Sequence, residues 1–171
     1  KPILTQLFAS LLLLLASQAS GQILSTNFVV TSPATPSPYS IGTKFVIELR
    51  VTNFTSIESM QFPITFNKDA MRFDSLTNPV FSNWTVANYS SYPTQGRIGV
   101  SWQADLGADP SGATLANNTA IFKLHFTGIG NGTTTVNISG TPGSAPPIPV
   151  EIARQGSGPL SPNCRNLIGP P

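Results

Sequence analysis

Apolar and polar residues alternate strictly over residues 59–67. The apolar members of this segment are Met60, Phe62, Ile64 and Phe66. A period of two places them on one face of a half-buried strand, with Ser59, Gln61, Pro63 and Thr65 on the other face. Pro63 has no N–H to give to a neighbouring strand, so the pattern predicts a strand at a sheet edge or at a bulge.

Short runs of β-branched and aromatic residues recur along the rest of the chain, separated by Gly, Pro, Asn and Ser. The further candidate strands are residues 27–31, 44–53, 71–77, 97–103, 119–128, 133–139 and 148–154. From Gln22 onward no convincing helical period is present. The pattern predicts an all-β fold, a two-sheet jelly-roll β-sandwich of about eight to nine strands.

The two ends of the chain differ from its middle. A leucine-rich apolar run at residues 3–15 follows Lys1 and precedes small residues up to Gly21, which is typical of a secretory signal peptide. The run is shorter than the roughly 20 residues that a membrane span needs. We therefore expect a signal peptide at 1–21, one domain at 22–154, and at 155–171 a Pro/Gly/Ser-rich linker to further modules. The mature protein would be secreted, extracellular or at the cell surface.

The composition offers little for catalysis or for nucleic-acid binding. The seven acidic and nine basic side chains form no basic stripe. The single histidine, His125, lies between Leu124 and Phe126, which predicts an outward-facing strand residue rather than a general base. No enzyme activity, cofactor or metal is expected; Asp105 and Asp109 fit solvated turn residues better than calcium ligands. The single cysteine, Cys164, is a spare thiol or pairs with a residue outside this sequence.

Three aromatic residues, Trp84, Tyr89 and Tyr92, cluster between two candidate strands. Their rings would either stack on sugar rings as a carbohydrate-binding surface or pack as a lid on the sandwich. Trp102 alternates in phase with Val100 and is expected in the core.

The order of several motifs resembles that of a cohesin domain. These motifs are Val51-Thr52-Asn53-Phe54, Met60-Gln61-Phe62, Met71-Arg72-Phe73, Gly96 to Trp102, Gly112-Ala113-Thr114-Leu115, Ala120 to Phe126 and Pro149-Val150-Glu151-Ile152. The resemblance covers roughly residues 28–154. Where cohesins commonly have a Tyr-Asp-Pro turn, this chain reads Phe66-Asn67-Lys68-Asp69, which is a departure from the family pattern.

This resemblance implies a non-catalytic module that docks a dockerin-type protein, with calcium carried by the partner, in extracellular polysaccharide-degrading or cell-surface assemblies. Docking would use one flat sheet face. Mapped by strand, the outward residues for that face are Gln61, Pro63, Thr65, Arg97, Gly99, Ser101, Gln103, Lys123 and His125. An ordinary solvated sheet surface would look the same. The alternatives are polysaccharide binding through Trp84, Tyr89 and Tyr92, or a structural spacer in a surface protein.

Overall fold

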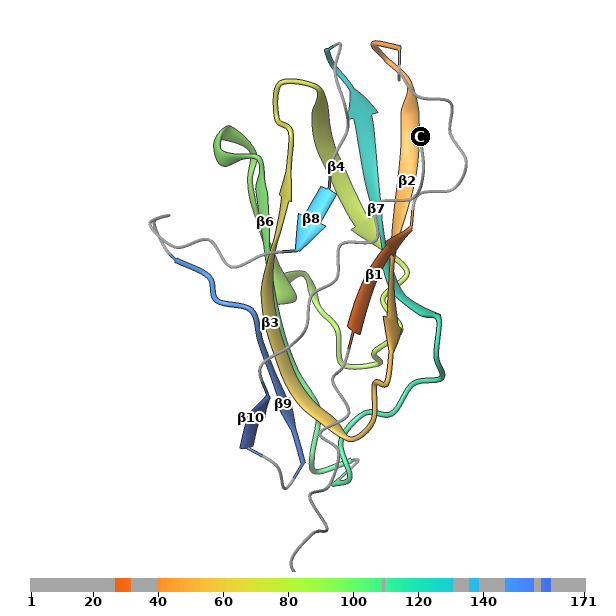
Figure 1. The fold of residues 1–171 in the computed structure, drawn as a ribbon, viewed down its shortest axis with the longest axis vertical. Coiled ribbons are helices and arrows are strands. Elements are labelled where there is room, and N and C mark those ends of the chain that lie inside the picture. The colour runs from red at the N-terminus through yellow and green to blue at the C-terminus, as the bar shows by residue number, and fades with distance from the viewer. Residues whose placement is uncertain are drawn as a thin grey trace, which may run out of the picture.

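Two antiparallel sheets pack face to face in the computed structural model (Figure 1). The structure describes residues 27–31, 40–108, 110–130, 136–138, 147–155 and 158–160. Sheet A has the strand order β1-β2-β7-β4, and sheet B has the order β10-β9-β3-β6-β5, with β8 also paired to β3. This arrangement confirms the predicted all-β sandwich.

The strands are β1 (Asn27–Thr31), β2 (Lys44–Thr52), β3 (Ile57–Phe66), β4 (Met71–Thr77), β5 (Tyr89–Tyr92), β6 (Arg97–Gln103), β7 (Thr119–Gly128), β8 (Val136–Ile138), β9 (Glu151–Arg154) and β10 (Gly158–Leu160). All eight strands predicted from the alternation are present. The sequence did not indicate β5, which lies between two short 3₁₀ turns, η1 (Val86–Asn88) and η2 (Pro93–Gln95), or β10.

Alternation along the strands builds the core between the two sheets. In β2, every second residue from Phe45 to Val51 is buried, and the residues between them are half-buried. The inward rings meet across the sandwich: the ring centres of Phe28 and Phe62 are 4.7 Å apart, and those of Phe66 and Phe126 are 5.3 Å apart. Burial of these apolar faces is the main source of the fold's stability.

The prediction that Pro63 marks a sheet edge or a bulge is wrong, because β3 lies in the middle of sheet B and its register shift against β9 falls between Ile57 and Ser59. On one side β3 pairs with β6 along most of its length. On the other side it pairs with β9 up to Gln61 and with β8 from Ile64 onward. Pro63 lies between these two stretches, so its missing N–H costs no ladder bond on the side where the partner changes.

The connection between β4 and β5 passes from sheet A to sheet B and brings aromatic residues to one end of the core. Phe81 stacks on Trp102 with ring centres 4.0 Å apart, and Trp84 lies 5.5 Å from Phe122. Trp102 is 4% exposed, which confirms its predicted place in the core. Packing of the aromatic crossover against the sandwich is confirmed for Trp84.

The expected domain boundaries stay a prediction. Residues 1–26, which include the expected leader, and the tail with Cys164 lie outside the described residues. Within the expected linker, Gly158–Leu160 forms β10 and pairs with β9.

Phe62 and Phe122 are both fully buried, one from each sheet. We expect Phe62→Ala and Phe122→Ala each to lower the free energy of unfolding by about 3 to 5 kcal/mol, because each loses transfer energy and leaves a cavity. Urea denaturation followed by fluorescence measures this change. Thr55→Ala, at an exposed loop position, is the control and should stay within about 0.5 kcal/mol of the wild type. If Phe62→Ala or Phe122→Ala lowered the free energy of unfolding by less than about 0.5 kcal/mol, the assignment of that residue to the core would be wrong.

Candidate binding face

Pairing of β3 with β6 brings most of the predicted docking residues onto one face, the outer face of sheet B. Gln61 lies opposite Ser101, Pro63 opposite Gly99, and Thr65 opposite Arg97. Gln103, at the end of β6, is exposed.

The expectation that Lys123 and His125 share this face is wrong. Both belong to β7, which lies in sheet A. Alternation tells which side chains leave the core, but it does not tell which of the two sheets a strand joins. The outward residues of β7 therefore point away from sheet B, on the other side of the sandwich.

Two predicted docking residues on β6 are covered by the protein's own chain. Arg97 is only 2% exposed, and its guanidinium carbon lies 4.4 Å from the centre of the Tyr92 ring. Gly99 is buried between Tyr92 and Ile148: a Cβ built there would lie 3.6 Å from Cε2 of Tyr92 and 2.8 Å from Cδ1 of Ile148. Pro63, opposite Gly99, is also buried. The accessible part of the predicted face is thus centred on Gln61, Ser101 and Gln103.

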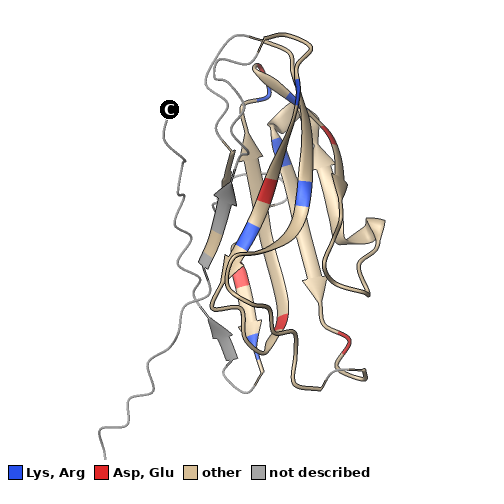
Figure 2. Cartoon of the chain, turned by 90° about the vertical axis from the view of Figure 1, so that its right-hand side faces the viewer, with Lys and Arg blue, Asp and Glu red and all other residues tan. Residues whose placement is uncertain are grey.

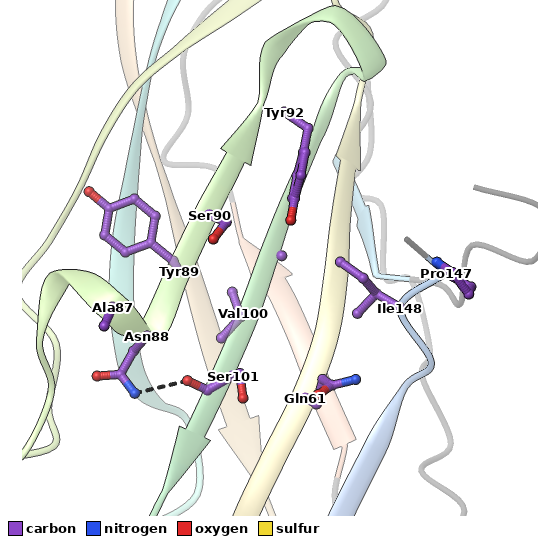
Figure 3. A pocket seen from close by; sticks show the side chains of 11 residues that line it. Gln61, Ala87, Asn88, Tyr89, Ser90, Tyr92, Val100, Ser101, Pro147 and Ile148 are labelled. Carbon is purple, nitrogen blue, oxygen red and sulfur yellow. Dashed lines mark hydrogen bonds between the residues drawn. The ribbon is translucent and has the colours of Figure 1, made fainter. Parts of the chain in front are cut away.

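A hollow of about 290 Å³ lies on the outer face of sheet B, and we call it the outer hollow (Figure 3). Its floor is β6 at Gly99–Ser101, and its sides come from β5 with η1, from Gln61, and from the segment at Pro147 and Ile148. Asn88 fixes η1 beside this floor, because its Nδ2 donates to the carbonyl of Ser101 at 2.9 Å and its Oδ1 accepts from the N–H of Thr85 at 2.7 Å.

The structure does not bring Trp84, Tyr89 and Tyr92 together on one exposed surface. Trp84 packs against Phe81 and Phe122. Tyr89 pairs with the core position Val100 and contacts the ring of Phe73 at 6.2 Å. Tyr92 pairs with Arg97 and lies on the outer face. Only Tyr92 therefore has its ring over the face of β6 that looks away from the core.

The outer face of sheet A has a different character, because charged residues of both signs occur along its strands (Figure 2). Glu48 forms ion pairs with Arg50 and, at 3.0 Å, with Lys123. A hydrogen bond from Lys123 and a weaker contribution from Arg50 lower the pKa of Glu48. Arg72 and Asp74 pair at 3.0 Å. Burial raises the pKa of Asp74, but hydrogen bonds from Thr127 and Arg72 outweigh this effect and lower it.

The residues considered for catalysis or metal binding have structural partners. His125 is half-buried on the outer face of sheet A, and its Nε2 lies 2.8 Å from Oγ1 of Thr77. Oδ1 of Asp105 accepts the backbone N–H of Gly107 at 3.1 Å, as in a polar turn. Asp109 lies outside the described residues. Among those that are described, no group of three or more His, Cys, Asp or Glu side chains is placed to hold a metal ion.

No protein-family model and no curated protein matches the sequence. Solved structures do match the fold. The sixth cohesin of scaffoldin B from Acetivibrio cellulolyticus, in complex with a mutant Cel5 dockerin, aligns with a TM-score of 0.61 and 15% identity over 83% of this chain and 95% of that chain. The cohesin of the OlpA complex from Clostridium thermocellum aligns with a TM-score of 0.61 and 11% identity over 82% of this chain and 94% of that chain.

A type II cohesin from the cellulosome of Acetivibrio cellulolyticus gives a TM-score of 0.59 and 12% identity over 83% of this chain and 92% of that chain. The chain therefore has the fold of a cohesin domain, as its motifs suggested. In the part of the chain that the structure describes, no helix has the length and apolar character to cross a membrane.

Because the pKa of Glu48 is lowered in the folded state, its contribution to the free energy of unfolding depends on pH. A carboxyl group whose pKa is lower in the folded state stabilises the fold above its ordinary pKa of 4.5, and this contribution is lost as the pH falls through the folded value. We expect Glu48→Gln to reduce the free energy of unfolding by less than about 1 kcal/mol at pH 7, because the pairs are partly solvated. Urea denaturation at pH 7 and pH 3 measures the difference from wild type. A difference that stays the same at both pH values would contradict this role of Glu48.

Proposed function

We propose that this protein is a non-catalytic docking module that binds a dockerin-type partner. The observation that carries the proposal is the cohesin fold, aligned over more than four fifths of the chain with domains that were solved in complex with dockerins. The calcium of such a complex would belong to the partner. The expected leader and linker are consistent with a place in an extracellular polysaccharide-degrading or cell-surface assembly.

We assign docking to the outer face of sheet B because of the cost of removing water from each face. On sheet A a partner would have to desolvate the ion pairs of Glu48 with Arg50 and Lys123, and burying paired charges is costly unless every group is compensated. On sheet B the accessible side chains of Gln61, Ser101 and Gln103 are polar and uncharged. Such side chains exchange hydrogen bonds with water for hydrogen bonds with a partner at lower cost.

The accessible surface on sheet B is smaller than the sequence implied. Thr65 is half-buried, and Arg97 lies under Tyr92. Docking would therefore centre on the end of β6 near Gln103 rather than on its beginning near Arg97. Glu151, which is exposed on β9 opposite Gln61, extends this surface and adds a charge at its margin.

The double substitution Gln61→Ala/Gln103→Ala tests this assignment. We expect it to weaken dockerin binding about tenfold or more, because it removes two hydrogen-bonding side chains from the centre of the interface. Calorimetry with dockerin modules encoded in the source genome, in the presence of calcium, measures the affinity. Lys123→Gln, on the outer face of sheet A, is the control and should leave binding unchanged.

Weakening by Lys123→Gln alone would move the docking surface to sheet A. Lack of binding by any of these dockerins would instead favour the structural-spacer alternative.

A further inference from the structure

The outer hollow has a defined shape. Tyr92 and Ile148 both lie over Gly99 in the β6 floor. Ser101 and Gln61 line the hollow on β6 and β3, and Ser90 lines it on β5 (Figure 3). The Tyr92 side chain lies along β6 with its hydroxyl toward the hollow.

Several features hold the walls of the outer hollow in place. Gly99 allows the Ile148 side chain to lie close against β6, since a Cβ there would come within 2.8 Å of Cδ1 of Ile148. The Tyr92 ring is fixed by the guanidinium of Arg97 at 4.4 Å. Asn88 ties η1 to the carbonyl of Ser101. Small-molecule sites in proteins are usually such largely preformed concavities.

The lining has a mixture of chemical groups without charge. Hydroxyl groups of Ser90, Tyr92 and Ser101 and the amide of Gln61 each donate and accept hydrogen bonds. Ile148 and the ring of Tyr92 supply apolar surface. Among the described residues, no Lys, Arg, Asp or Glu side chain lines the hollow, so this lining offers no counter-charge to an ionic ligand.

A pyranose ring matches this lining. Its hydroxyls both donate and accept hydrogen bonds, and its C–H groups pack on apolar and aromatic surface. A volume of about 290 Å³ corresponds to one sugar unit rather than to a chain of several units. We propose that the outer hollow binds a single neutral hexopyranose unit, free or at the end of a glycan, as a function beyond protein docking.

Titration of the isotopically labelled full chain, followed by amide NMR, tests this proposal. The probes are D-glucose, D-galactose and D-mannose, with D-glucuronate as the charged counterpart. We expect at least one neutral sugar to shift the amide signals of Ser90, Gly99 and Ser101 in a saturable way, and glucuronate to bind about tenfold more weakly, because its carboxylate finds no cation in the lining.

Two variants remove the hydrogen-bonding groups and leave the backbone unchanged. Ser90→Ala/Ser101→Ala should weaken sugar binding about tenfold, and Tyr92→Phe, which keeps the ring over Arg97, should weaken it severalfold. Ser91→Ala is the matched control, because Ser91 is the neighbour of Ser90 but does not line the hollow. The Ser91→Ala variant should bind the sugar with the same affinity as the wild type.

The proposal is overturned if none of the three neutral sugars shifts these signals, or if the double variant binds the sugar as well as the wild type does. It is also overturned if only dockerin modules shift these signals, since the hollow would then be part of a protein interface. Gln61 belongs to both surfaces, but Gln103 does not line the hollow and Ser90 lies outside the assigned docking surface. Gln103→Ala alone and Ser90→Ala alone therefore distinguish failure of docking from failure of the sugar site.

Discussion

The position of Pro63 in the central strand β3 is the constraint on which much of sheet B depends. A proline inside a sheet is tolerated only where no partner needs its N–H. Sheet B meets this requirement by changing the neighbour of β3 from β9 to β8 at this point. The residues that precede β9 then place Ile148 over Gly99, the partner of Pro63 on β6. The outer hollow, which both Gly99 and Ile148 line, lies beside this change of strand partner.

The two outer faces of the sandwich differ because their charges are distributed unequally. The ion pairs of Glu48 with Arg50 and Lys123 lie on sheet A, where water screens them and they contribute little to stability. On sheet B the basic residue of β6, Arg97, is buried under Tyr92, so its charge is withdrawn from the surface. The face of sheet B is partly concave and carries the charge of Glu151 at its margin, whereas the face of sheet A is charged and solvated, so the former is better suited to binding.

Much of the fold can be predicted from the sequence because side-chain alternation is a local property. The alternation of Met60, Phe62, Ile64 and Phe66 identified both the strand and its inward face, and all four residues are buried. The neighbours of a strand are a long-range property, and for this reason the pattern placed β3 at an edge and Lys123 beside Gln61. The alternation also marked Arg97 as outward, which is correct, but it carried no sign that Tyr92 from β5 would cover it.

The pairing of Arg97 with Tyr92 also explains why the hollow keeps its shape. A buried guanidinium loses its hydration, and stacking on an aromatic ring compensates part of that loss. Rotation of the Tyr92 ring away from Arg97 would give up this compensation. The ring is therefore held against β6 before any ligand arrives, and a ligand does not have to meet the entropic cost of ordering it. In this way a residue that is itself inaccessible helps to define a concave surface of sheet B.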